Sequence, residues 1–343
     1  MTAISTTSTL RWGLIGPGNI AEQFAEALTV IPGSRLHAVA GRSKPKAEQF
    51  AQDHGAEFYY DSHLALLDDS SVDAVYIATP HRYHFEQARD CLLAGKSVLC
   101  EKPMCVNARE AHELIELSRT NGVFLMEALW TRFLPIYEVV NQWLASGKIG
   151  TVTSVNSSFG FAIGENRSGR LFDPALAGGA LLDMGVYNIS MSQWVFGSNP
   201  VGHSIEGVIG DSGVDEHSKT RLKYSDDRWS IFENSLTRQL DNALTIYGTQ
   251  GRIRLDTMFW SATRATLTPV KPDSVSSPPV SAVRNFRATG LEYQIESAQR
   301  CIQSGLIECP EISHANTLDT MKVMDALRND LGLIYEFEDG RLI

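Results

Sequence analysis

Ten residues near the amino terminus, WGLIGPGNIA (residues 12–21), determine how the rest of the chain is interpreted. A short apolar run, residues 12–15, leads directly into two glycines, and a helical pattern begins just after them. Glycines at this point let the backbone approach a pyrophosphate, and the amino end of the following helix offers N–H groups without partners in the helix. The stretch therefore predicts a dinucleotide site, although a plain structural turn is the alternative. The residues predicted to bind are Gly16, Gly18, Asn19 and Ile20.

The first third of the chain alternates short β-rich runs with helical stretches. Such alternation is typical of βαβ units, which build a parallel sheet with helices on both faces. We therefore predict an α/β protein in which a disordered tail, residues 1–10, precedes a doubly wound nucleotide-binding domain, residues 11–130. The expected strands are 12–15, 36–40, 72–78, 97–100 and 123–126, and the expected helices are 20–28, 45–54, 85–94 and 108–121.

The alternation of strands with helices ends at about residue 132. The expected strands there are 151–157, 204–209, 219–224, 230–237, 243–247 and 252–256, and the expected helices are 291–304 and 316–330. Strands joined only by turns form a largely antiparallel sheet, and residues 248–251 (GTQG) fit a hairpin turn. Residues 131–343 are therefore predicted to form a second, α+β domain. A Pro/Ser-rich loop, residues 269–279, is expected to be mobile or to border the active site.

The composition argues against several classes of protein. The 343 residues carry 40 acidic and 30 basic side chains, so the formal net charge of −10 disfavours a nucleic-acid partner. No apolar run approaches the roughly 18 residues that span a bilayer, so no membrane association is expected. The amino terminus has neither the basic nor the apolar region of a secretory signal. The five cysteines form no C-x-x-C pair and are expected to be reduced thiols of a cytoplasmic protein.

The end of the second expected strand bears on the choice of cofactor. An NAD site usually presents Asp or Glu to the ribose 2′-hydroxyl at this position. Arg42 and Ser43 stand there instead, and a guanidinium with a hydroxyl suits the 2′-phosphate of NADP. We therefore predict NADP in preference to NAD, with a solvated basic turn as the alternative.

Two further expected strands run into polar residues at 78–84 (ATPHRYH) and 100–103 (CEKP). Open α/β sheets bind ligands at such carboxyl ends of parallel strands. The proline after Lys102 cannot continue the strand ladder, and a lysine held there needs a polar partner, so a catalytic or cofactor contact is predicted, with a solvated lysine as the alternative. The other predicted cofactor contacts are Thr79, Pro80, His84 and Glu101. A metal site of His81, His84, Cys100 and Cys105 is an alternative, but its spacing matches no structural zinc motif.

A glycine turn that leads into a helix is predicted for residues 178–187 (GGALLDMGVY). Asp183 and Tyr187 are four residues apart and therefore share one helical face. A carboxylate beside a phenol can orient a substrate hydroxyl next to a proton acceptor. Taken alone, such a pair is more typical of a helix surface.

These pieces together resemble one protein family, the Gfo/Idh/MocA oxidoreductases. The residues that carry the resemblance are 16–21, 78–84, 100–103, 126–133 (MEALWTRF) and 178–187, and the likeness extends over nearly the whole chain from Arg11. Many relatives carry His where this chain has Tyr187, which points to the branch of dimeric dihydrodiol dehydrogenases and NADP-dependent D-xylose 1-dehydrogenases. The resemblance implies a Rossmann domain joined to a substrate domain with a large open sheet.

The resemblance also implies roles for individual residues. Lys102 would contact the reacting hydroxyl and the nicotinamide ribose, Asp183 would orient the substrate, and Tyr187 would be the acid or base. A phenol ordinarily has a pKa of about 10, so the positive charges of Lys102 and the nicotinamide would be needed to favour the phenolate. The remaining predicted contacts are Arg132 with the cofactor, and Trp130, Phe159, Trp260 and Phe286 with the substrate.

The implied reaction transfers a hydride between the nicotinamide and a hydroxyl-bearing carbon. Aromatic walls suit a sugar, a polyol or a cyclic trans-diol equally, so the sequence leaves the small-molecule substrate open. The alternative is a non-catalytic regulator of the same fold that binds a dinucleotide. The presence of Lys102, Asp183 and Tyr187 favours an enzyme.

The second half of the chain also predicts assembly. Between residues 204 and 256 several strands follow one another without a helix, so few helices are available to cover both faces of their sheet. Exposed apolar sheet faces are typical of interaction surfaces. We therefore expect a homodimer or higher homo-oligomer formed through the C-terminal sheet. The alternation there is imperfect, so some of the apolar residues are expected to face the domain's own core. The apolar residues considered are Leu222, Tyr224, Ile231, Leu236, Leu244 and Ile246.

Overall fold

The computed structural model describes residues 9–164, 167, 169–270 and 278–338, and these form two compact units. The first unit contains the described residues up to Cys105, together with Arg109–Trp130 and Arg287–Thr317. The second contains Val106–Ala108, Thr131–Phe286 and the described residues from Leu318 onward.

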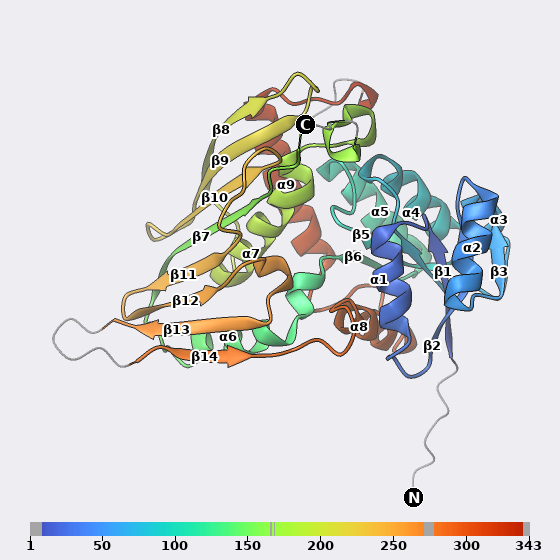
Figure 1. Cartoon of the computed structure of the whole chain (residues 1–343), viewed down its shortest axis with the longest axis horizontal. Helices are drawn as coiled ribbons and strands as arrows, with labels where there is room; N and C mark the ends of the chain where they lie inside the picture. Colours follow the sequence, from blue (N-terminus) through green and yellow to red (C-terminus); the bar gives the residue numbers. More distant parts are fainter. Residues whose placement is uncertain (1–8, 165–166, 168, 271–277, 339–343) are drawn as a thin grey trace, which may run out of the picture. The chain divides into compact units, whose positions relative to one another are not determined.

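The first unit is built on a six-stranded parallel sheet in the order β3-β2-β1-β4-β5-β6 (Figure 1). All four residues of β4 are buried, as expected for a central strand with helices on both faces. The order reverses direction between β1 and β4, which is where doubly wound sheets bind ligands. The strands are β1 (Leu10–Ile15), β2 (Ser34–Ala40), β3 (Phe58–Tyr60), β4 (Ala74–Ile77), β5 (Ser97–Glu101) and β6 (Leu125–Ala128). The helices are α1 (Asn19–Leu28), α2 (Lys44–His54), α3 (His63–Leu67), α4 (His84–Leu93), α5 (Ala108–Asn121) and α8 (Glu292–Gln303).

Helix α8 belongs to the first unit, although the sequence analysis placed it in the second domain. Its Gln299 donates a hydrogen bond to the carbonyl of Pro32 at 3.1 Å, and its side-chain oxygen accepts one from Ser34. Thr289, just before the helix, donates to the carbonyl of Gln23 at 3.1 Å. Helical periodicity reveals an apolar face but not the surface that covers it, so this docking was not predictable from the pattern.

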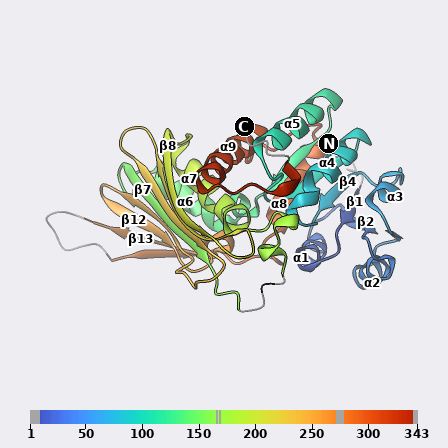
Figure 2. The same ribbon diagram turned by 90° about the horizontal axis from the view of Figure 1, so that it is seen from above.

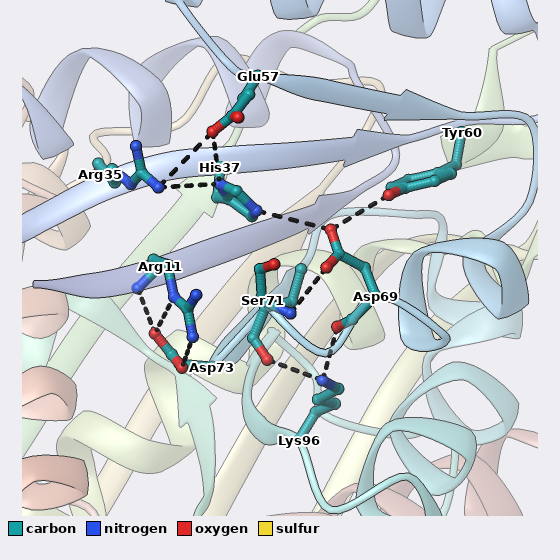
Figure 3. A network of polar contacts seen from close by, with 10 residues as sticks. Arg11, Arg35, His37, Glu57, Tyr60, Asp69, Ser71, Asp73 and Lys96 are labelled. Atoms are coloured by element: carbon teal, nitrogen blue, oxygen red, sulfur yellow. Dashed lines mark hydrogen bonds and ion pairs between the residues drawn. The ribbon is translucent and has the colours of Figure 1, made fainter.

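Polar contacts join the amino ends of several strands in this unit (Figure 3). The backbone N–H and the guanidinium of Arg11 both bind the carboxylate of Asp73, each at 2.9 Å. Lys96 donates to the backbone carbonyls of Asp69 and Val72, both at 2.8 Å. These contacts link the segments that lead into β1, β4 and β5, at the edge of the sheet formed by the amino ends of its strands.

The second unit is built on an eight-stranded sheet in the order β14-β13-β12-β11-β7-β10-β9-β8. All neighbouring strands are antiparallel except β7 and β10, so the predicted fold class is confirmed. Helices α6 and α7 pack on one face of this sheet (Figure 2). The strands are β7 (Val152–Gly160), β8 (Gly202–Ile209), β9 (Asp215–Lys223), β10 (Trp229–Ser235), β11 (Leu244–Gly248), β12 (Gly251–Leu255), β13 (Arg264–Pro269) and β14 (Val280–Val283). The helices are α6 (Pro135–Ala145), α7 (Val186–Phe196) and α9 (His314–Leu331), of which the first four residues belong to the first unit.

Several short or peripheral elements were missed from the sequence. Strand β3 has three residues and helix α3 has five, too few for a periodic pattern to be recognised. Helix α6 and strands β13 and β14 were also not predicted. The expected loop at residues 269–279 falls mainly on 271–277, outside the described residues, and so do residues 1–8 of the expected tail at 1–10. Leu10 already belongs to β1.

Most of the apolar residues considered for the open face of the large sheet face its core instead. Of the six apolar residues considered for it, Ile231 is 45% exposed, whereas Leu222, Tyr224, Leu236, Leu244 and Ile246 are buried. The face that β9 and β10 turn toward solvent carries mainly charged side chains. Its members include Lys219, Arg221, Lys223 and Glu233, with the guanidinium of Arg221 3.6 Å from the ring centre of Trp229. Alternation along a strand separates two faces without specifying which one the core covers.

No helix in the described part of the chain has the length and apolar character that a membrane crossing needs. All five cysteines are buried free thiols.

Candidate nucleotide and substrate sites

A cleft of about 410 Å³ lies in the first unit at the carboxyl ends of β1, β2 and β4. It is bordered by the glycine turn after β1, by the residues that follow β2 and by Thr79 and Pro80 after β4. The side chains and backbone of these segments meet there because parallel strands end at the same edge of the sheet.

The two positions in the turn are occupied by glycine for different physical reasons. Gly16 has φ +91°, and an ideal Cβ there would lie 2.7 Å from Cγ2 of Thr79 and 3.1 Å from the Ala78 backbone. Gly18 begins α1 in an extended conformation, and an ideal Cβ on it would meet no protein atom within 4 Å. The first glycine is therefore required by the turn itself, whereas the second leaves space beside the helix start. That space fits a pyrophosphate, which needs close access to the N–H groups of the first helical turn.

Basic side chains line the part of the cleft that follows β2. Arg42, Ser43 and Lys46 all border the cavity. The guanidinium of Arg42 lies 5.8 Å from the ring centre of Tyr83, which also lines the cleft. Ser43 precedes α2 without using its hydroxyl to cap the helix. The arrangement can accept an anionic group beside a ribose.

A further wall of the cleft follows β3 and was not predicted from the sequence. Asp61, Ser62 and His63 line it, and Ser62 caps α3 by accepting a hydrogen bond from the N–H of Ala65 at 3.2 Å. His63 Nε2 lies 3.0 Å from a carboxylate oxygen of Asp90. The Asp-Ser pair after two tyrosines is a helix-start signal that could have revealed this segment.

His84 braces the loops after β4 and β5. One ring nitrogen lies 2.7 Å from the carbonyl oxygen of Thr79, and the other lies 2.9 Å from that of Pro103. The Lys102–Pro103 peptide bond is cis. Two strand-end loops that were predicted to bind ligand are thus held together through one imidazole.

Glu101 is buried at the end of β5, immediately before the half-buried Lys102. The hydroxyl of Tyr76 donates to its carboxylate at 2.6 Å, and the N–H of Lys102 donates to its other oxygen at 3.3 Å. These contacts give Glu101 a structural role in shaping the turn that carries Lys102.

In the second unit, a π-helical turn, Leu181–Gly185, precedes α7 and carries Asp183. Asp183 is nearly buried, and its carboxylate accepts a hydrogen bond from Arg170 at 3.0 Å. Tyr187 follows in the first turn of α7 and is also buried. The predicted helix therefore exists, but its first turn is wider than an α-helical turn.

Aromatic rings surround Tyr187 in this unit. Phe159 from β7 stacks on Trp260 with ring centres 3.4 Å apart, and the ring centre of Tyr187 lies 5.6 Å from that of Phe159. Phe259 packs edge-on against Trp260. The structure thus brings together three of the residues predicted to contact substrate, and it gives the phenol an apolar flank.

The remaining predicted site residues lie on three other segments. Asn19 and Ile20 lie in the first turn of α1, while Trp130 and Arg132 lie in the 3₁₀ turn Trp130–Phe133. Phe286 is half-buried at the end of its segment of the second unit. Within the described residues, no cluster of three or more His, Cys, Asp or Glu side chains could hold a metal ion.

Comparison with known proteins agrees with this geometry. A family model described as an oxidoreductase family with an NAD-binding Rossmann fold matches residues 10–129, and the GFO/IDH/MocA C-terminal domain matches residues 137–254. The trans-1,2-dihydrobenzene-1,2-diol dehydrogenase of Danio rerio is 34% identical over 330 residues, which cover 95% of this chain and 98% of that protein. The chain belongs to the Gfo/Idh/MocA oxidoreductase family.

Other known proteins are similar to this chain over most of its length. The human protein of the same name as the Danio rerio relative is also 34% identical, over 95% of this chain and 98% of its own. A 3-ketoreductase from Actinomadura kijaniata, solved with NADP and TDP-benzene, has a TM-score of 0.82 and 26% identity, covering 94% of this chain and 98% of that one. The aldose-aldose oxidoreductase from Caulobacter crescentus, 21% identical with a TM-score of 0.84 over 97% and 98% of the chains, shares the fold. The predicted family is thus confirmed, and this chain is an oxidoreductase of the nicotinamide-dependent dehydrogenase and reductase class.

Proposed function

We propose that this protein is an NADP-dependent oxidoreductase that transfers a hydride to or from a hydroxyl-bearing carbon of a sugar, a polyol or a cyclic trans-diol. The observation that carries the proposal is the surroundings of Tyr187. Its phenol lies beside the stacked rings of Phe159 and Trp260, and it follows Asp183 by one helical turn. A proton-transferring hydroxyl, a polar orienting group and an apolar wall are what a ring-shaped alcohol requires.

The choice of NADP rests on the cleft of the first unit. Arg42, Ser43 and Lys46 border it just after β2, and a guanidinium, a hydroxyl and an ammonium group suit a phosphate dianion. Gly16 and Gly18 keep the backbone open for the pyrophosphate. The bound dinucleotide supplies the hydride acceptor or donor at its nicotinamide ring.

The chain's own residues handle the proton. Tyr187 accepts the hydroxyl proton during oxidation and returns it during reduction, while Asp183 orients a neighbouring hydroxyl. The ammonium group of Lys102 favours the phenolate of Tyr187 and polarises the carbonyl in the reverse reaction. Lys102 and Tyr187 belong to different units, and the proposal assigns them to one reaction on the basis of their motifs.

The substrate class rests on ring chemistry and on the relatives. Stacked aromatic rings favour a flat or cyclic substrate face, and curated relatives are named for a cyclic trans-diol. Neighbouring hydroxyls on such a ring give Asp183 and Tyr187 one oxygen each.

A turnover screen tests the proposal. NADP⁺ and NAD⁺ are each combined with aldoses, inositols and trans-dihydrodiols, and formation of the reduced cofactor is followed by absorbance. We expect turnover with at least one member of the panel and a preference for NADP⁺. Tight NADPH binding without turnover on any member would favour a non-catalytic regulator instead.

We also propose a cytoplasmic homodimer or higher homo-oligomer formed through the open face of the large sheet. The five buried free thiols suit a reducing compartment. Ile231 and the Arg221–Trp229 pair offer apolar area among the charges of this face, which two-fold pairing would cover. Sedimentation at micromolar concentration should give at least twice the 37.8 kDa monomer mass, and a monomer mass would remove the proposal.

A further inference from the structure

One buried acid of the second unit has no part in the proposed reaction. Asp215, the first residue of β9, is 0% exposed. One of its carboxylate oxygens accepts a hydrogen bond of 2.6 Å from the N–H of Leu181, the residue that begins the π-helical turn. Its other oxygen has no hydrogen-bond partner among the described residues. A carboxylate in such surroundings is costly, so its presence calls for a physical reason.

The glycine turn before the π-helical turn is shaped around this carboxylate. Gly179 has φ +122°, and an ideal Cβ on it would overlap the unpartnered oxygen of Asp215. The N–H of Asp183 donates to the carbonyl of Gly179 at 3.3 Å. Asp215 therefore contacts both the residue that receives the Asp183 N–H and the residue that starts the turn.

Residues of other segments bind the opposite side of the turn. Arg170 binds the carboxylate of Asp183, and the hydroxyl of Tyr335 donates to the carbonyl of Gly178. An ideal Cβ on Gly178 would lie 2.6 Å from the carbonyls of Arg170 and Leu171, so the backbone is closely packed there as well.

We propose that Asp215 is a positioning residue for the proposed reaction, because its carboxylate fixes the amino end of the turn that carries Asp183 and leads to Tyr187. The strand β9 is bound to β8 and β10 on either side, so it gives the helix start a rigid support. A charged acceptor at a helix start makes a stronger hydrogen bond than a neutral one and also favours the helix dipole. The proposal deepens the proposed function and rests on it.

Protonation of Asp215 couples this support to pH. Burial raises the pKa of Asp215 to about 7, while the N–H of Leu181 and the charge of Arg328 act in the opposite direction. The ionisable groups that face it from other elements are Arg328 on α9, and Tyr335 and Glu338 near the end of the chain; Arg328 is ion-paired with Glu338. Burial and the charge of Asp215 raise the pKa of the Tyr335 phenol, so it stays protonated through neutral pH. Asp215 is thus the group of this cluster that changes charge near pH 7.

The sign of the effect on stability follows from linkage. An unfolded aspartate has a pKa of about 4, so the folded protein holds a proton on Asp215 that the unfolded chain has lost between roughly pH 4 and pH 7. The contribution of Asp215 to stability is therefore fully present below about pH 4, falls as the pH rises, and is lost once the pH has passed about 7. Ionisation strengthens the acceptor for the Leu181 N–H, so positioning improves as the pH rises through about 7.

The variant Asp215→Asn keeps the shape of the side chain and removes its charge. We expect kcat to fall about tenfold above pH 7, the scale of weakening one charge-assisted hydrogen bond, with KM for the dinucleotide unchanged. The step near pH 7 in the wild-type kcat profile should disappear. Asp173→Asn, at a carboxylate that caps the preceding 3₁₀ turn, Pro174–Leu176, in an exposed hydrogen bond, is the matched control and should keep the wild-type profile.

Two measurements do not depend on turnover. Urea unfolding between pH 5 and pH 8.5 should show a component of wild-type stability that falls up to about pH 7 and then levels off, and this component should be absent from Asp215→Asn. Amide exchange at Leu181 and Asp183 should be about tenfold faster in Asp215→Asn at pH 8. If both match the wild type, Asp215 does not hold the turn, whatever the substrate panel shows. If both change as expected but no panel member reacts, the proposed function fails and the support role stands.

Discussion

Replacing Arg42 by aspartate tests the assignment of the cofactor directly. Arg42 borders the cleft after β2 with Ser43 and Lys46, and its guanidinium lies over the Tyr83 ring. The substitution removes a charge-assisted hydrogen bond to a 2′-phosphate and places a carboxylate near it. NAD lacks this phosphate, so its binding should change little.

The magnitude follows from the exposure of the site. A hydrogen bond to a charged group contributes about 1.5–3 kcal/mol. Because the Arg42 side chain is exposed, repulsion by the new carboxylate is largely screened and adds about 1 kcal/mol at most. Lys46 remains on the same wall and offsets part of the loss. We therefore expect Kd for NADP⁺ to rise about a hundredfold, while Kd for NAD⁺ stays within about threefold.

Lys44→Asp is the matched control for this experiment. It makes the same change of charge two residues away, at a side chain directed to the ring of Tyr59, 6.0 Å from its centre, and absent from the cleft lining. Calorimetric titration of the wild type and both variants with both dinucleotides at one ionic strength gives the four ratios of variant Kd to wild-type Kd that the comparison needs. Equal losses of NADP⁺ affinity in Arg42→Asp and Lys44→Asp would mean that the overall electrostatic field of this surface, and not a contact with Arg42, determines binding. An unchanged ratio of Kd for NADP⁺ to Kd for NAD⁺ in Arg42→Asp would refute the assignment.

Two further predictions concern catalysis and acid stability. Lys102→Ala and Tyr187→Phe should each lower kcat about a hundredfold, the usual contribution of a positioned acid or base, while NADPH still binds by fluorescence titration; near-normal turnover would remove that residue from the mechanism. Partial burial acts to raise the pKa of Asp73, but the hydrogen bonds and charge of Arg11 hold it below its ordinary value. Its contribution to stability is thus present above about pH 4 and lost as the pH falls below it. Asp73→Asn should be less stable than wild type in urea at pH 7, and the gap should narrow at pH 3; a gap that stays constant with pH would contradict this reasoning.

Sequence pattern alone was sufficient for the elements with strong local signals. The apolar run before Gly16 and the alternation of strands with helices were enough to predict the parallel sheet, because hydrophobic periodicity and turn residues are local properties of the chain. The same signals placed Thr79 and Lys102 at strand ends, where parallel topology gathers ligand-binding residues at one edge. The two-residue hairpin between Gly248 and Gly251 was likewise readable from its glycines, and the structure confirms it.

Tertiary structure decided what depends on contacts between distant segments. The wall of Asp61, Ser62 and His63 was missed because β3 and α3 are too short to show a period. The placement of α8 against α1 depends on surface complementarity that no single helix pattern contains. Which face of the large sheet is exposed to solvent also depends on which face the helices cover, and this is a tertiary contact.

The glycine turn before Asp183 combines both kinds of information. Its sequence predicted a turn and a helix, since glycine-rich segments and apolar periodicity are local features. Only the fold brings Asp215, from a strand more than thirty residues later in the chain, against Gly179 and the N–H of Leu181. The cost of burying that carboxylate depends on how much water the surrounding strands and helices remove, and this is a property of the packed structure that the sequence does not contain.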